Sequence, residues 1–398
     1  MKSGTISIIA TILLTASCRT GNSDRGASSA ALPYLIDLER GIGSAESVPL
    51  STVTSEIEYV PLETDTACML RRISNLALCD SFIVVSDGTK LLLFDRQGNF
   101  LIPVGSVGRG PEEYTYIRSF FVDENSREIY LLSMGKVMVF GFNGKYKRSF
   151  KADFRPSQVI SRDQNTLMFH LFNMSGPSPD TAWSWYITDR QGVILSRILN
   201  HHKRVSQPGL IVPDSPLYLY NNTAHFLEFG NDTLYYYNKQ EMEPYAIFNA
   251  GKLKMETDLH LTPETIREVS DRIEGNFWIR DIHENDDFLF VNLAWGLSDS
   301  VSYSIYDKKN ARIAVLKDDG FTDDINGGPA FWPLSIGDNN TLVDYEDAFT
   351  FLQKIKAGNS GTSEENAGKI TQELEELGKS IDESSNPVLV IARLKKSF

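Results

Sequence analysis

The sequence predicts an all-β protein, a six-bladed β-propeller with a short helical hairpin insertion in the last blade. Three observations predict it. A pattern of two strands joined by a turn that contains Asp, Asn or Gly occurs five times. The copies alternate apolar and polar residues with period two, which indicates strands and excludes a helical solenoid. Further strand-like runs lie between the copies, and about four short strands in a repeat of roughly 40–50 residues are typical of propeller blades.

The five copies define five expected blades. The first four copies begin 46 to 49 residues apart, and the fifth follows after 69. The copies are LLLFDRQGNFLIPVG (91–105), VMVFGFNGKYKRSF (137–150), WYITDRQGVILSRI (185–198), LYYYNKQEMEPYAIF (234–248) and YSIYDKKNARIAVL (303–316). The strand-like runs between them are 81–87, 127–134, 165–172, 223–229 and 286–295.

A sixth blade is expected from the two ends of the repeat region. The strand pair TLVDY (341–345) and PVLVIARLK (387–395) lies at the C-terminal end, and SEIEYVPLET (55–64) precedes the first copy. We expect the latter to add one strand to the last blade, because this closes the ring and leaves few exposed edges. Cys68 and Cys79 flank an expected innermost strand and are predicted to stay unpaired. Eleven extended steps would separate them by about 30 Å, whereas a disulfide needs Cα atoms within ~7 Å.

Two insertions interrupt the repeat with helical patterns. Residues 262–273 begin with Thr262 and Pro263, typical of a helix start. Residues 346–379 carry two helical stretches, and Thr362 with Glu365 forms a capping-box pattern before the second. We expect their apolar faces to pack on the blade rim, with docking of a partner as the alternative. These faces contain Phe349, Leu352 and Ile355 in the first stretch and Ile370, Leu374 and Leu377 in the second.

The N-terminus carries an export pattern. Lys2 precedes a short apolar run, and small residues then lead to Cys18, which resembles the lipobox of bacterial lipoproteins. We expect residues 1–17 to be a signal peptide, Cys18 to be lipidated and 18–48 to be a flexible tether rich in Ser, Gly and Ala. The propeller then covers 49–398. An ordinary secretory signal, with Cys18 unmodified, is the alternative.

Composition and charge narrow the function. The chain has 398 residues with a formal net charge of −13, and an acidic surface disfavours nucleic acid as a partner. Three Cys and six His leave little material for a zinc or disulfide framework. Asp318, Asp319, Asp323, Asp324 and Asn326 concentrate oxygen donors, but the EF-hand spacing is absent. We therefore expect no cofactor, with calcium as a possible exception in a segment that is better interpreted as a turn.

Several stretches resemble a known family. VGSVGRGPEEYTYIRSFFVDENSREIYLLSM (104–134) followed by KVMVFGFNGKYKRSF (136–150) resembles the six-bladed β-propeller lipoproteins of Bacteroidota, which are similar to NHL-type propellers. DDINGGPAFWP (323–333) and NPVLVIARLKK (386–396) resemble that family's last blade. The resemblance covers about residues 50–398. It implies the fold and a lipid anchor in the outer membrane, but no activity, because that family is largely of unknown function. A single acid, Asp24, in the six residues after Cys18 favours a periplasm-facing protein over surface display.

The candidate ligand site lies on two connections between blades. Arg109, Glu113 and Tyr114 lie in the GRGPEEY turn, and Asp324 and Asn326 occupy the corresponding place before the last blade. We expect both turns to open on one face, around the concave end where propellers bind small ligands. A cation, an acid, an amide and an aromatic ring would suit a polar, uncharged ligand such as a sugar. In the alternative, Arg109 and Glu113 pair with each other and merely brace their turn.

The sequence therefore favours a cell-envelope protein that acts as a binding scaffold for a glycan, a peptide or an envelope protein, and anchors to the membrane through its lipid. No catalytic residue is assigned. An enzyme, a lyase or hydrolase with a metal in the central channel, is a first alternative, although the six histidines fall at irregular blade positions. A structural subunit of an outer-membrane complex, docked through 346–379, is a second.

Overall fold

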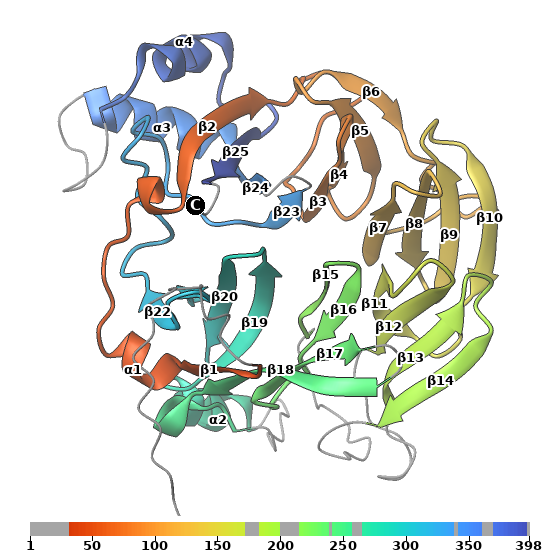
Figure 1. The fold of residues 1–398 in the computed structure, drawn as a ribbon. Coiled ribbons are helices and arrows are strands. Elements are labelled where there is room, and N and C mark those ends of the chain that lie inside the picture. Colours follow the sequence, from red (N-terminus) through yellow and green to blue (C-terminus); the bar gives the residue numbers. More distant parts are fainter. Residues whose placement is uncertain are drawn as a thin grey trace, which may run out of the picture.

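Six sheets arranged around one axis make up the described part of the chain (Figure 1). The structure is a computed structural model that describes residues 32–171, 183–199, 215–238, 241–256, 265–337, 341–359 and 369–395. Five sheets have four strands, and the sixth has a fifth strand added. The predicted six-bladed, all-β propeller is confirmed. In the described residues, no helix is long and apolar enough to cross a bilayer.

Blades 1 to 3 each contain four antiparallel strands that follow one another in the chain. Blade 1 contains β3 (Asn75–Leu78), β4 (Phe82–Ser86), β5 (Leu91–Asp95) and β6 (Phe100–Pro103). Blade 2 contains β7 (Ser119–Asp123), β8 (Glu128–Ser133), β9 (Lys136–Gly141) and β10 (Tyr146–Lys151). Blade 3 contains β11 (Pro156–Ser161), β12 (Thr166–Leu171), β13 (Trp183–Asp189) and β14 (Ile194–Leu199).

Blades 4 and 5 repeat this order, and blade 6 combines both ends of the repeat region. Blade 4 contains β15 (Leu217–Tyr220), β16 (Thr223–Phe226), β17 (Thr233–Asn238) and β18 (Glu241–Asn249). Blade 5 contains β19 (Phe277–Glu284), β20 (Phe288–Trp295), β21 (Val301–Asp307) and β22 (Arg312–Val315). Blade 6 contains β23 (Ser335–Gly337), β24 (Thr341–Glu346), β25 (Val388–Leu394) and β2 (Thr54–Pro61).

The ring closes through β2, as the sequence predicts. This strand pairs antiparallel with β25, from Thr54 opposite Leu394 to Pro61 opposite Val388. The first strand of every blade lies innermost, because β3, β7, β11, β15, β19 and β23 contact one another around the axis. The five predicted copies correspond to the two outer strands of blades 1 to 5, and the runs between them correspond to the second strands.

The repeated turn requires a glycine for a steric reason. Gly98 and Gly144 have φ of 87° and 72°, and a Cβ at either would lie 2.3 Å from a carbonyl oxygen on the preceding outer strand, Pro61 O or Pro103 O. The same contact carries backbone hydrogen bonds, from Glu63 N to Gly98 O (2.8 Å) and from Gly105 N to Gly144 O (2.9 Å). Only glycine allows this approach at positive φ. The glycine recurs in the turn because consecutive blades contact each other at this position.

The folded part begins earlier than expected. Residues 34–37 form β1 (Tyr34–Asp37), which pairs parallel with β18, and α1 (Leu38–Ile42) follows it. Ile36 and Leu38 are almost completely buried between blades 4 and 5. The assignment of 33–48 to a flexible tether is therefore wrong, because these two side chains supply the apolar burial that a tether lacks. The signal peptide, Cys18 and the rest of the tether lie outside the described residues.

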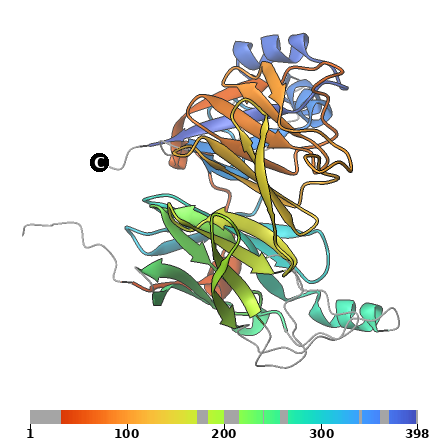
Figure 2. The ribbon, with the colours of Figure 1, turned by 90° about the vertical axis from the view of Figure 1, so that its right-hand side faces the viewer.

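Helices α3 (Ala348–Asn359) and α4 (Gln372–Ser380) lie between β24 and β25, at the outer rim of blade 6 (Figures 1 and 2). Phe351, Ile355 and Leu374 pack together with Val388 of the blade. The expected apolar face of α3 is wrong at Phe349, which is 52% exposed while Phe351 is buried. The N-cap of α4 is Thr371, and the predicted capping box at Thr362 and Glu365 lies outside the described residues.

Two further predictions concern smaller features. Helix α2 (Ile266–Ile273) is present in the first insertion, and its expected start at Thr262 and Pro263 lies outside the described residues. Cys68 and Cys79 are both buried, and neither forms a disulfide, as predicted. The RRISNLAL segment forms the innermost strand β3 only over Asn75–Leu78.

Candidate functional site

The GRGPEEY turn is braced by its own backbone. The Glu113 carboxylate accepts a hydrogen bond from Gly110 N at 2.8 Å, and no ion pair joins it to the exposed Arg109 within the described ranges. Tyr114 is 3% exposed. Its hydroxyl donates to Val104 O (2.9 Å) and accepts from Leu91 N (3.2 Å), and burial raises its pKa to about 12. Tyr114 is a core residue and offers no ring to a ligand.

The second predicted turn is tied down in a similar way. Asp324 accepts hydrogen bonds from the backbone N–H and hydroxyl of Ser51. Asn326 donates its N–H to Asp323 Oδ1 at 2.8 Å and accepts from Thr371 N at 3.2 Å. The two turns belong to different connections, blade 1 to blade 2 and blade 5 to blade 6.

The acidic segment considered for calcium uses its carboxylates as turn acceptors. Asp323 Oδ1 accepts from Ile325 N and Asn326 N, and Asp323 Oδ2 accepts from Gly328 N and from the Tyr59 hydroxyl at 2.6 Å. Among the residues that the structure describes, no three His, Cys, Asp or Glu side chains gather closely enough to hold a metal ion. The local hydrogen bonds thus hold both carboxylate oxygens of Asp323 within the turn.

Three arginines lie at one end of the propeller axis. Each blade has four antiparallel strands, so all innermost strands run in the same direction and begin at the same end of the axis. Arg118 and Arg155 directly precede β7 and β11, and Arg72 lies three residues before β3. All three side chains are exposed. Three consecutive blades therefore present a guanidinium at this end, which we call the arginine end of the axis.

Local backbone irregularities accompany two of the arginines. Arg155 has φ of 54°, a left-handed conformation that costs a non-glycine residue on the order of 1 kcal/mol or more. A fourth arginine, Arg280, lies in β19 where the register with β20 shifts between Ile279 and Asp281. Ile279 and Ile282 are buried between blades, whereas Arg280 is exposed. A bulge redirects a side chain in this way, so Arg280 is freed from the interblade core.

Two carboxyl groups on blade 6 have raised pKa values. Asp344 accepts a hydrogen bond from Trp332 N at 2.9 Å, and burial raises its pKa to about 7. Burial also raises the pKa of Glu346 to about 6. Tyr303 of blade 5 lies close enough to feel charges on both sides, because burial and then the charges of Asp344 and Asp319 raise its pKa while Arg280 lowers it. Near neutral pH Asp344 is partly protonated, so its negative charge beside Tyr303 is reduced.

Two buried pairs of polar side chains have residue types that occur in catalytic sites, but a substrate cannot reach them. Ser157 Oγ lies 2.9 Å from His170 Nδ1, yet both residues are 1% exposed, and burial lowers the His170 pKa to about 3. Lys308 and Glu284 form an ion pair whose side chains are 5% and 0% exposed. Neither pair presents a nucleophile or base to a substrate. Sequence reasoning missed both, because their members come from different strands.

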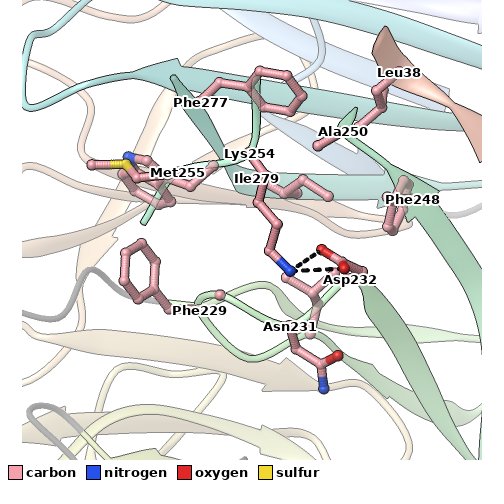
Figure 3. Close-up of a pocket in the computed structure, with 13 residues that line it drawn as sticks. Leu38, Phe229, Asn231, Asp232, Phe248, Ala250, Lys254, Met255, Phe277 and Ile279 are labelled. Atoms are coloured by element: carbon pink, nitrogen blue, oxygen red, sulfur yellow. Dashed lines mark hydrogen bonds and ion pairs between the residues drawn. The ribbon is translucent and has the colours of Figure 1, made fainter. Parts of the chain in front are cut away.

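One enclosed pocket lies between blades 4 and 5 (Figure 3). Its volume is about 30 Å³, the space of one water molecule. Lys254 reaches across it to Asp232 at 2.7 Å, and Phe229, Met255 and Phe277 line it (Figure 3). A pocket of this size offers little room for a ligand, and its lining side chains belong to the contact between the two blades.

Comparison with known families matches residues 33–393 to the family described as Domain of unknown function (DUF4934). The chain belongs to this family. The DUF4934 match begins one residue before β1, consistent with the early start of the fold. Comparison with curated protein sequences found no relative.

Two solved structures that resemble this DUF4934 chain come from Bacteroides. The "Putative exported protein" of Bacteroides fragilis NCTC 9343 is 18% identical, with a TM-score of 0.71, over 91% of this chain and 99% of that one. A member of the DUF4221 family from Bacteroides vulgatus is 12% identical, with a TM-score of 0.53, over 86% and 97%. At these identities the likeness shows the fold alone.

Proposed function

We propose that this protein is a binding module of the cell envelope that takes an anionic ligand, an acidic glycan, at the arginine end of its axis. The observation that carries the proposal is the position of Arg72, Arg118 and Arg155 before the innermost strands of three consecutive blades, with Arg280 exposed at a bulge within the innermost strand of blade 5. In a chain with a net charge of −13, such a gathering attracts carboxylate or sulfate groups locally. Planar guanidinium groups bind such groups with two parallel hydrogen bonds.

The proposal places the ligand on other residues than the sequence does. Tyr114 is buried, and the carboxylates of Glu113 and Asp324 are held by backbone and hydroxyl donors. The arginine end retains the predicted ligand class, a glycan, but changes its charge from neutral to acidic. An acidic peptide is the competing ligand, and the test below separates it.

Localisation is part of the proposal. We propose that the chain is exported, lipidated at Cys18 and held at the outer membrane facing the periplasm. Support comes from the N-terminal pattern that ends at Cys18 and from the similar Bacteroides fragilis protein, whose name describes export. A glycan ligand fits this location, because envelope polysaccharides are available there.

The binding test compares ligands of one size and different charge. Calorimetry would measure an oligogalacturonate, the matched neutral oligosaccharide and an oligoglutamate at two salt concentrations. We expect the oligogalacturonate to bind and its affinity to fall with salt. Arg72→Gln, Arg118→Gln and Arg155→Asn should each weaken it by about tenfold or less singly and more in combination; Asn tolerates the left-handed backbone of Arg155. Arg40→Gln, which replaces an exposed arginine of α1 beside the outer strand β22, is the matched control. Equal binding of the neutral sugar, or no effect of the three substitutions, would contradict the proposal.

A structural subunit is the second candidate function, favoured by one observation on α3. In this second candidate, α3 and α4 form a hairpin inserted in blade 6 that docks on a partner in the outer membrane. Phe349 makes the contact, since its side chain is 52% exposed. Replacing Phe349 by Ser leaves the buried Phe351 in place. Loss of a co-purifying envelope protein in this variant alone would favour docking, and unchanged co-purification would exclude it.

A further inference from the structure

A second cavity, separate from the arginine end, lies on the outer side of blades 5 and 6. It has a volume of about 300 Å³, which is the lower end of the range for small-ligand sites. One wall is the chain segment 46–53, which runs along the outer side of blades 5 and 6 between α1 and β2 (Figure 1). The other wall comes from strands β20, β21 and β22 of blade 5.

Backbone hydrogen bonds fix the segment at both ends of the cavity. Glu46 N donates to Val315 O and Lys317 N donates to Glu46 O, both at 2.9 Å. At the other end, Leu50 N donates to Thr322 O at 2.8 Å and Lys395 N donates to Val53 O at 2.9 Å. Because the wall is held by the fold on both sides, the cavity is formed before any ligand arrives, which lowers the entropic cost of binding.

The body of the cavity is apolar. Val53 and Ile305 are buried, and Phe288 and Ala314 are partly exposed. Val48 and Pro49 of the segment complete this surface. A hydrocarbon group placed here gains roughly 25 cal/mol for each Å² removed from water. The lining therefore favours a ligand with an aliphatic or aromatic body.

The charged groups of the lining are unequal in number. Glu46, Asp307 and Arg312 line the cavity, which gives two acids and one base. The Asp307 carboxylate accepts hydrogen bonds from Lys309 N and Asn310 N at 2.9 Å and from Asn310 Nδ2 at 2.7 Å. These donors are neutral, so they orient the carboxylate and leave its charge in place. The lining carries a net negative charge and favours a cationic head group.

We propose that this cavity binds a small primary amine, with its apolar body on Phe288, Ile305 and Ala314 and its ammonium group at Glu46 and Asp307. Arg312 then disfavours ligands with a second positive charge on the same side, which selects monoamines over diamines. The site is independent of the arginine end, since it lies at the outer rim and takes the opposite charge.

Three probes with the same aromatic body test the sign of the head group: 2-phenylethylamine, 3-phenylpropionate and 2-phenylethanol. Ligand-observed NMR titration of the purified protein would measure each dissociation constant. We expect 2-phenylethylamine to bind, and 3-phenylpropionate to bind at least about tenfold more weakly, with 2-phenylethanol between them. Glu46→Gln should weaken only the amine and bring its affinity close to that of the alcohol. Glu46 is exposed, so this variant keeps the fold.

Two further variants locate the binding. Ala314→Phe fills the cavity and should abolish binding of all three probes, whereas Arg72→Gln at the arginine end should change none of them. Equal affinity for the amine and the carboxylate would overturn the proposal. Unchanged amine binding in Glu46→Gln, or no detectable binding of the amine, would also overturn it. None of these results bears on the acidic glycan, which is measured separately.

Discussion

The ammonium group of Lys308 donates a hydrogen bond to the carboxylate of Glu284, and both side chains are buried at the boundary between blades 4 and 5. Blade 4 contributes two further donors to that carboxylate, the hydroxyls of Tyr218 (2.6 Å) and Tyr245. The Tyr220 ring lies 4.2 Å from the Lys308 Nζ atom. A single carboxylate thus joins three strands of two blades.

Removing one charge of this pair should destabilise the protein strongly. Lys308→Met leaves the Glu284 carboxylate buried without a cation, and we expect a loss of about 3–5 kcal/mol in the free energy of unfolding. The double variant Glu284→Gln/Lys308→Met is uncharged and keeps an oxygen acceptor for one of the two tyrosines, so it should be more stable than Lys308→Met alone. Urea denaturation of the variants in a double-mutant cycle measures this. A double variant less stable than either single one would show that the charges matter less than the packing.

Asp344 should make stability depend on pH. Its folded pKa of about 7 lies above the value of 3.8 for an unperturbed Asp, so the folded state holds this proton more tightly than the unfolded state does. The resulting stabilisation is complete below about pH 4 and is lost as the pH rises through about 7. Asp344→Asn removes this term while keeping an oxygen acceptor for Trp332 N. We expect the variant to exceed the native protein in stability by more at pH 8 than at pH 5, by about 1 kcal/mol or more.

Glu346 is a second titrating group that remains in the Asp344→Asn variant. Its pKa is also raised, to about 6, so Asp344→Asn should retain part of the decline in stability with pH. Denaturation at pH 5, 6.5 and 8 separates the two contributions. Parallel curves for the native protein and the variant would rule out Asp344 as the source.

The GRGPEEY turn should respond differently to its two charged residues. Glu113→Ala removes the acceptor of Gly110 N and should cost about 0.5–1.5 kcal/mol. Arg109→Ala removes an exposed side chain and should change stability by less than about 0.5 kcal/mol. Thermal unfolding of the two variants side by side measures the difference. If both variants lost stability equally, the two residues would act as a pair after all.

Cys18→Ala should release the protein from the membrane. No apolar span follows in the described residues, and a lipid contributes about 0.8 kcal/mol for each buried CH₂ group. We expect the variant in the soluble periplasmic fraction, without incorporation of labelled palmitate. Cys68→Ala, a buried thiol, is the control and should leave the labelling unchanged. Palmitate found on the Cys18→Ala protein would show that another residue carries the lipid.

The repeat was visible in the sequence because its cause is local. Asp95 holds its turn by accepting hydrogen bonds from Gln97 N and Asn99 N, and Gly98 must be glycine where it touches Pro61 O. Such constraints recur in other blades, so the pattern recurs too. The segment YLID, by contrast, becomes strand β1 only by lying along β18, more than 200 residues away, and four residues beside a Ser- and Ala-rich stretch carry no local sign of that partner.

The candidate sites were harder to predict for the same reason. Arg72, Arg118 and Arg155 are unremarkable in the sequence, and only the common direction of the innermost strands brings them to one end of the axis. Tyr114 shows the opposite error. A conspicuous aromatic in a Gly-rich turn suggested a ligand contact, but its hydroxyl is needed by Val104 O and Leu91 N inside the fold. Position in the sequence indicates which residues share a turn. It does not indicate which of their side chains point into the protein core.

The pairing of β2 with β25 has a consequence for biosynthesis. A ribosome makes β2 more than 300 residues before its partner, so blade 6 is incomplete until β25 has emerged. Until then β2 has no paired edge, and the apolar side chain of Val60, which the finished protein buries, is exposed. A chain interrupted before residue 388 lacks the closing strand. It should therefore be recognised as unfinished by proteases that act on exposed strands, which makes β25 a checkpoint for the whole ring.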